Sequence, residues 1–103
     1  MVFVDQVYDV TSNWPKEEIF GLTSQLRRGS TSVMLNIAEG SSRTAKDFGH
    51  FVSLARGSCY ECVAILTIAK RRNYINEEKF NELYEWCEKL SKMLSALKKS
   101  LNE

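Results

Sequence analysis

The sequence predicts an all-α fold, an antiparallel up-down-up-down four-helix bundle, on three observations. Apolar residues recur at spacings of three and four along most of the chain. The 103 residues include one proline and five glycines, which leaves long uninterrupted stretches and disfavours a β fold with many turns. The links between the periodic segments are short, so consecutive helices must pack as antiparallel neighbours. We expect a single domain spanning residues 1–103.

The last periodic segment gives the clearest helix. Its apolar residues alternate steps of three and four: Phe80, Leu83, Cys87, Leu90, Leu94, Leu97 and Leu101. Asn76 can cap its start, and acidic residues follow where they suit the positive end of the helix dipole. Upstream, apolar residues from Phe48 to Ala69 recur at spacings of three and four and predict a second long helix over residues 44–72, and Thr44 and Asp47 can form a capping box at its start.

The segment from Leu22 to Glu39 also has helical spacing, but it is rich in small and polar residues. Gly40 follows it, and we expect this glycine to end the helix in the left-handed conformation. Gly29 and Ser30 lie on its apolar face, where small side chains let another helix approach closely at some cost in helix propensity. Before it, Phe3 to Trp14 is a short amphipathic piece.

Composition limits the class of protein. The net charge is +1, and hydrophobic residues make up 44% of the chain, which is typical of a globular protein. The first residues resemble no signal peptide, and no run approaches the roughly 18 apolar residues of a membrane span, so we expect no membrane partner. Three cysteines are an odd number without a secretory context, so we expect reduced thiols and a cytoplasmic location.

Basic residues gather in the middle of the chain. Residues 27–72 hold eight basic side chains against three acidic ones, whereas both flanking segments are net acidic. Such a segment is compatible with an anionic partner such as RNA or DNA, or with the ordinary charged faces of a bundle. The candidate nucleic-acid-binding residues are Arg27, Arg28, Arg43, Lys46 and Arg56. In the structural alternative, these arginines bridge to carboxylates such as Glu39 or Glu61.

No catalytic constellation is evident, so we expect no enzyme and no cofactor. Cys59 and Cys62 have the spacing of a redox or metal motif, but they lie mid-helix on the apolar face. Core packing is the favoured interpretation, and a zinc site with Cys87 the weaker one, since a structural zinc needs four ligands. His50 is the single histidine and has no nucleophile beside it.

Several motifs resemble the 23S rRNA intervening sequence proteins, a bacterial family of four-helix bundles. The segments that carry the resemblance are Phe20 to Arg28, read as FGLTSQLRR, then Asn36 to Gly40, read as NIAEG, then Arg43, Asp47-Phe48, Phe51, Ala55 to Ser58, and Glu61. Together they cover roughly residues 14–75. Family members usually have a proline where Met34 stands and alanines where Gly29 and Ser30 stand, so this helix should be straighter than usual. The first helix also looks shorter than is usual.

The resemblance implies a left-handed bundle and a homopentamer, with a molecular role that is largely unassigned. The implied fold is also similar to that of the accessory variability proteins of diversity-generating retroelements, basic pentamers that bind nucleic acid. A module whose partner is another protein, without nucleic-acid binding, remains the alternative.

Close helix approach could serve a second subunit as well as the bundle itself. The candidate interface residues between copies are Gly29, Ser30, Asn36 and Trp86. Tyr84 and Trp86 flank the leucine seam, and we expect Trp86 to face outward and Tyr84 to pack at the edge of the core.

Overall fold

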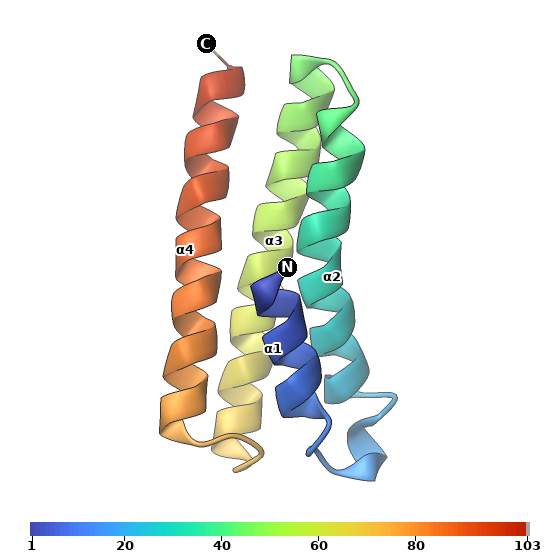
Figure 1. The fold of residues 1–103 in the computed structure, drawn as a ribbon, viewed down its shortest axis with the longest axis vertical. Helices are drawn as coiled ribbons and strands as arrows, with labels where there is room; N and C mark the ends of the chain where they lie inside the picture. Colours follow the sequence, from blue (N-terminus) through green and yellow to red (C-terminus); the bar gives the residue numbers. More distant parts are fainter. Residues whose placement is uncertain (103) are drawn as a thin grey trace.

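The structure, a computed structural model, describes residues 1–102 and contains α-helices without strands over that range. Its helices are α1 (Val2–Thr11), α2 (Leu22–Ser41), α3 (Ala45–Arg71) and α4 (Glu77–Leu101), with a short 3-10 turn, η1, at Lys16–Glu18. Successive α-helices run in opposite directions (Figure 1). The predicted all-α class is confirmed, and the up-down-up-down arrangement agrees with the prediction.

The helix starts follow local side-chain chemistry. The Thr44 hydroxyl accepts a hydrogen bond from the Asp47 amide at 3.3 Å, and the Asn76 side chain accepts one from the Lys79 amide at 2.7 Å. Each cap satisfies an amide that the first turn leaves without a helical partner. Between α3 and α4, Asn73 takes a left-handed backbone with φ 63°, a conformation that asparagine tolerates better than most residues. The chain can therefore reverse within a short link.

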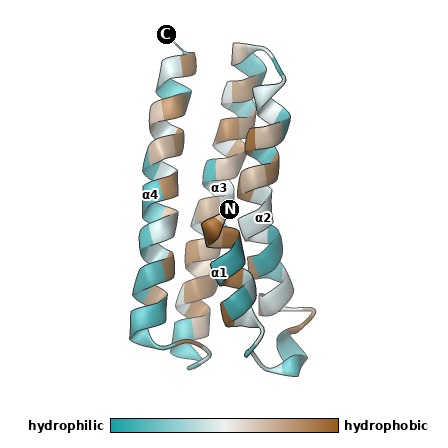
Figure 2. Cartoon of the chain, viewed as in Figure 1, coloured by the Kyte–Doolittle hydropathy of each residue, from teal (hydrophilic) through white to brown (hydrophobic). Residues whose placement is uncertain are grey.

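The core lies where the apolar seams of the helices meet. Figure 2 shows the hydrophobic residues of α4 on the side that faces α3. Leu83, Cys87, Leu90 and Leu94 of the predicted seam are buried, and Phe80, Leu97 and Leu101 are partly buried against them. Burying such side chains is the main favourable term in the stability of a chain of this size.

The end of α2 corrects one prediction. Gly40 lies inside the helix, α2 continues through Ser41, and no glycine of the described chain has a positive φ. The absence of a side chain at Gly40 lets α3 approach α2 closely. A Cβ at Gly40 would lie 2.7 Å from the Cβ of Phe51 and 2.8 Å from Cδ1 of Phe48. The sequence shows that a small residue stands there, but it does not reveal which neighbour requires it. α2 is continuous past Met34, as expected without a proline.

Helix α1 covers only part of the bundle. Its 10 residues span ~15 Å, whereas the 25 residues of α4 span ~37 Å. α1 therefore lies against the half of the bundle that holds the α3–α4 link, and the N-terminus is at mid-height (Figure 1). The other half is built from α2, α3 and α4 alone.

Helix α3 corrects a second expectation. It is long and apolar enough to pass for a membrane span by length and composition. Charged residues such as Arg56 interrupt the apolar run of this helix but lower its mean hydropathy little. The apolar side of α3 is buried in the bundle, where Val52, Leu66 and Ala69 are fully covered. This pattern is typical of a core helix.

Candidate nucleic-acid interface

The charged side chains divide unequally between the two halves of the bundle. We define the basic half as residues 30–60 and 91–102, the part beyond the level at which Tyr60 of α3 meets Ser91 of α4. It holds six basic side chains, namely Arg43, Lys46, Arg56, Lys92, Lys98 and Lys99. Its acidic side chains are Glu39 and Asp47. The rest of the described chain has more acidic than basic side chains, so one end of the molecule has a net positive charge and the other a net negative charge.

Arg27 makes contacts within its own chain. Its Nε donates to the buried Thr11 hydroxyl at 2.8 Å, and its guanidinium carbon lies 4.7 Å from the centre of the Tyr8 ring. The Thr11 hydroxyl in turn donates to the Val7 carbonyl at 2.7 Å. These contacts fasten α1 to α2, which is a structural role, but the partners are a hydroxyl and a ring and not the carboxylates that the structural alternative expected.

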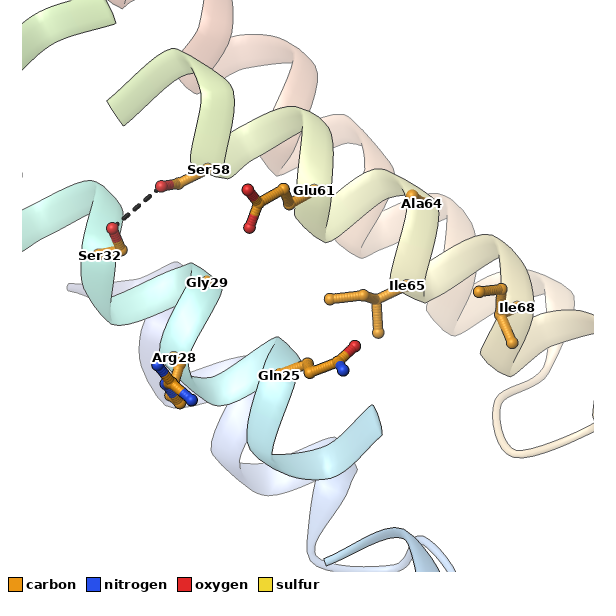
Figure 3. A pocket seen from close by; sticks show the side chains of 9 residues that line it. All are labelled: Gln25, Arg28, Gly29, Ser32, Ser58, Glu61, Ala64, Ile65 and Ile68. Atoms are coloured by element: carbon orange, nitrogen blue, oxygen red, sulfur yellow. Dashed lines mark hydrogen bonds between the residues drawn. The ribbon is translucent and has the colours of Figure 1, made fainter. Parts of the chain in front are cut away.

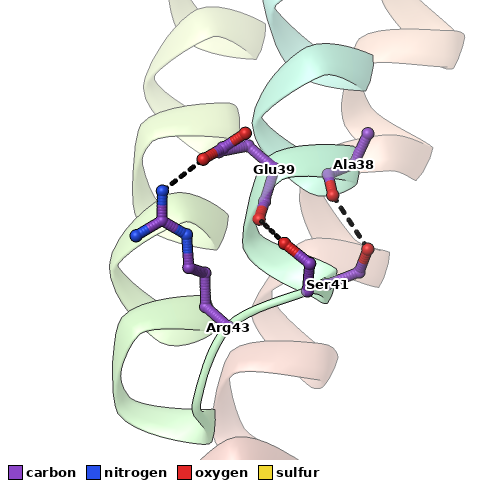
Figure 4. A network of polar contacts seen from close by, with 5 residues as sticks. Ala38, Glu39, Ser41 and Arg43 are labelled. Atoms are coloured by element: carbon purple, nitrogen blue, oxygen red, sulfur yellow. Dashed lines mark hydrogen bonds and ion pairs between the residues drawn. The ribbon is translucent and has the colours of Figure 1, made fainter.

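Arg43 is also engaged. It forms an ion pair with Glu39 across the end of α2, and its guanidinium carbon lies 5.5 Å from the centre of the Phe51 ring (Figure 4). Hydrogen bonding to Glu39 raises the pKa of Arg43. Ser41 adds a hydrogen bond to the Ala38 carbonyl at 2.9 Å, which satisfies one of the last carbonyls of the helix. Much of the Arg43 charge is therefore compensated locally, although its side chain stays exposed.

Arg28 and Lys46 are exposed, with no ion pair within residues 1–102, but they lie far apart. Arg28 lies in the half that also holds α1, whereas Lys46 lies in the first turn of α3 in the basic half. The candidate residues thus do not form one continuous patch.

Arg56 lies beside the hydroxyl of Tyr60 on α3. The Arg56 side chain is half-buried, and its Nε is covered without any hydrogen-bond acceptor among the described residues. Ser91 of α4 donates to the Tyr60 oxygen at 3.5 Å, and the pKa of Tyr60 is lowered, first by Ser91 and then by Arg56. The arrangement brings a cation with spare donors next to an exposed aromatic ring.

Lys98 is a site residue that the sequence interpretation missed. Lys98 donates to the hydroxyl of Ser53. This hydrogen bond joins α4 to α3 two helical turns closer to the start of α3 than the contact between Ser91 and Tyr60. Lys98 lies in the last turn of α4, where a cation suits the helix dipole, and nothing local in the sequence indicates its partner on α3. Aligning the predicted helices of residues 44–72 and 76–101 as antiparallel neighbours could have identified this contact from the sequence.

The predicted interface residues between copies have different surroundings. Gly29 forms the floor of an open groove of about 670 Å³ between α2 and α3 (Figure 3). Asn36 is half-buried, and its amide donates to the Ser32 carbonyl at 2.9 Å. Ser30 is 0% exposed and donates to the Arg27 carbonyl, so it lies inside the bundle and offers no surface to a second copy.

The groove beside Gly29 has walls of opposite charge. Arg28 of α2 stands on one wall and Glu61 of α3 on the other, and neither makes an ion pair within the described range. Ser32 and Ser58 bridge the floor through a hydrogen bond of 3.0 Å, drawn in Figure 3. A floor of small residues between charged walls can admit a helix from another molecule.

Trp86 and Tyr84 reverse the expected exposures. Trp86 is half-buried against the core, beneath the ammonium group of Lys89 at 5.2 Å from the ring centre. Tyr84 is 39% exposed and stacks on Phe80 with ring centres 5.9 Å apart. Trp86 lies on the side of α4 that meets α1, and this neighbour could not be assigned from the spacing alone.

The three cysteines are free and buried. Burial raises the pKa of the Cys59 thiol and raises that of Cys87 to about 12, so neither is a ready nucleophile. A Cβ at Gly29 would lie 3.0 Å from Sγ of Cys62, which places that sulfur in the contact between α2 and α3. Within residues 1–102, no cluster of three or more histidine, cysteine or acidic side chains could hold a metal ion. The cytoplasmic location inferred from these thiols stays a prediction.

Comparison with known proteins supports the fold and the family. Residues 1–96 match the family described as 23S rRNA-intervening sequence protein. A crystal structure from Bacteroides thetaiotaomicron, described as a protein with unknown function from the S23 ribosomal protein family, has a TM-score of 0.82 and 23% identity. The match covers 95% of this chain and 90% of that one. No curated protein matches the chain significantly.

Proposed function

This chain belongs to the 23S rRNA-intervening sequence protein family, and we propose that it is a non-enzymatic, oligomeric bundle that binds nucleic acid through its basic half. The observation that carries the proposal is the gathering of six basic side chains with two acidic ones at one end of the molecule. Neither Arg56 nor Lys98 has a carboxylate within ion-pair distance in the described range. Unpaired cations of this kind can neutralise phosphates.

Assembly would strengthen this interaction. Each copy adds the same basic half, so an oligomer presents the charges several times over. The groove between α2 and α3 supports self-association, because a second copy can bring an acidic group to Arg28 and a basic group to Glu61. Five copies, the number that the resemblance implies, is part of the proposal.

A binding measurement across a salt series tests the proposal. We expect labelled structured RNA or duplex DNA to bind with an affinity that falls steeply as salt rises, because bound phosphates release counterions. The double variant Lys46→Gln/Lys98→Gln should bind more weakly than the parent. Its matched control, Lys16→Gln/Arg71→Gln, removes the same charge from the other half and should bind nearly as well as the parent.

Three outcomes would contradict the proposal or a part of it. If neither nucleic acid binds at low salt, nucleic-acid binding is wrong, and the groove between α2 and α3 becomes the main binding surface. If both double variants lose affinity equally, the binding is not located in the basic half. Light scattering on the same samples gives the number of copies, and a monomer at all concentrations would refute the assembly.

The groove itself favours a second candidate function, a scaffold whose partner is another protein. Arg43 is paired with Glu39, as that alternative expects, and Arg27 is engaged by the Thr11 hydroxyl. The groove also has Ile65 and Ile68 along its α3 wall, and Ile68 is 44% exposed. An apolar helix could cover them.

A further inference from the structure

The outer surface between α3 and α4 combines cations, hydroxyls and one exposed ring. We call it the α3–α4 seam and define it by Ser53, Arg56, Tyr60, Ser91, Lys92 and Lys98. Lys98 contacts Ser53, and Ser91 contacts Tyr60, seven residues along each helix. Seven residues of α-helix rise ~10.5 Å, so the two contacts are separated by about three nucleotides of a stacked strand.

Tyr60 offers a stacking surface in this seam. It is 57% exposed, although tyrosine rings carry a large apolar area that folding usually covers. Beside it lies a cavity of about 300 Å³, with Val63 and Tyr84 on its apolar lining and Ser91 and Lys92 on its polar side. Bases of every type have a π face, so an aromatic ring in an apolar recess accepts an unpaired base without selecting its sequence.

Two cations of the seam, Arg56 and Lys98, lie on the same side of this ring along the bundle, towards the start of α3. Arg56 stands one turn before Tyr60 on α3, and its covered Nε has no acceptor. Lys98 of α4 stands further along in the same direction, level with Ser53. The acidic residue that lines the cavity is Glu88, which is paired with Lys92 at 3.7 Å. From that pair towards Lys98, neither residues 53–60 of α3 nor residues 91–98 of α4 include a carboxylate.

We propose that the α3–α4 seam binds unpaired nucleotides of RNA or DNA, with a base stacked on Tyr60 and the phosphates that follow on one side of that base on Arg56 and then Lys98. This inference rests on the proposed function and names its ligand class, the single strand. A duplex keeps its bases stacked inside, so it can reach the cations but cannot use the ring.

Fluorescence anisotropy with a labelled single-stranded oligonucleotide, and with a duplex of the same sequence, tests the inference on the full-length protein. We expect the single strand to bind more tightly than the duplex at equal salt. Tyr60→Leu should weaken single-strand binding at least about five-fold, whereas Tyr60→Phe, which keeps the ring, should bind like the parent. Because Tyr60 is exposed, neither change should prevent folding, and circular dichroism verifies this.

A matched pair of lysines tests the phosphate contact. Lys98 and Lys99 are neighbours in sequence, but only Lys98 contacts Ser53 across the seam. Lys98→Gln should reduce the slope of log affinity against log salt by about one, and Lys99→Gln should change it less.

The outcomes separate this inference from the broader proposal. If nucleic acid binds but Tyr60→Leu matches Tyr60→Phe, or if the duplex binds as tightly as the single strand, the seam is not the site for unpaired nucleotides, while nucleic-acid binding stands. Equal effects of the two lysine changes overturn the phosphate contact. If no nucleic acid binds at low salt, both proposals fail.

Discussion

Two glycines inside helices should respond to alanine with opposite signs. Gly57 lies in the middle of α3, is exposed, and has no atom within 4 Å of an added Cβ. Gly57→Ala therefore gains helix propensity without a new contact, and the free energy of unfolding should rise by about 0.5–1 kcal/mol.

Gly40→Ala introduces a methyl group where none fits. The added Cβ would lie 2.7 Å from the Cβ of Phe51, an atom fixed to the α3 backbone that no rotation of the ring can move away. Overpacking of this kind costs about 1–3 kcal/mol, whereas the propensity gain is below about 1 kcal/mol because Gly40 stands next to the last residue of α2. We expect a net destabilisation of about 1–2 kcal/mol.

Urea denaturation followed by circular dichroism measures both effects. For a domain of this size, 1 kcal/mol corresponds to about 4–8 °C in Tm, so thermal melts resolve the difference as well. All proteins must be compared at one concentration, because assembly adds to apparent stability. If Gly40→Ala stabilises the protein as much as Gly57→Ala, the close contact between α2 and α3 at Gly40 is not real.

Three further predictions concern burial and ionisation. Leu94→Ala should lower the free energy of unfolding, measured by urea denaturation, by about 2–4 kcal/mol because Leu94 is 3% exposed. Met93→Ala should change it by less than about 0.5 kcal/mol because Met93 is 59% exposed. Equal effects would contradict the assigned faces of α4. The Cys87 thiol, with a pKa of about 12, should react with a disulfide reagent at pH 8 only after urea unfolds the chain, and rapid labelling of the native protein would refute its burial. Hydrogen bonding to Tyr74 holds the pKa of Glu18 in the folded protein below its usual 4.5. The ionised Glu18 carboxylate therefore stabilises the fold above pH 4.5, and this stabilisation is lost as the pH falls through the lowered pKa. A pH series of urea midpoints checks this, and Glu18→Gln should lose less stability than the parent between about pH 5 and pH 3.

The helices themselves were predictable from the sequence. The apolar spacing of α4 and the caps at Thr44 and Asn76 involve residues at most a few positions apart, and such local signals also fix where helices begin. Gly40 was misassigned because its constraint comes from two phenylalanines on the next helix. A pattern within one helix contains no information about that contact.

The candidate site was less predictable for the same reason. Arg27 and Arg28 are adjacent in sequence, yet Arg27 is held by Thr11 and Tyr8 while Arg28 stands on the wall of a groove. Periodicity shows that the two side chains point to different sides, but not what each side meets. The Lys98–Ser53 contact joins residues 45 positions apart, and only the register of α3 against α4 brings them together.

By itself the sequence determined the helical class, the short links and the bounds of most helices, because propensity, periodicity and capping act over a few residues. The tertiary structure alone decided where the charge lies. In the sequence, the basic residues occupy the middle and the ends are net acidic. The antiparallel turn between α3 and α4 returns the lysine-rich end of α4 to the start of α3 (Figure 1), so a basic middle becomes a basic end. When the chain reverses, the register between the packed helices decides which charged residues lie side by side. That register depends on packing between helices and not on the order of the residues alone.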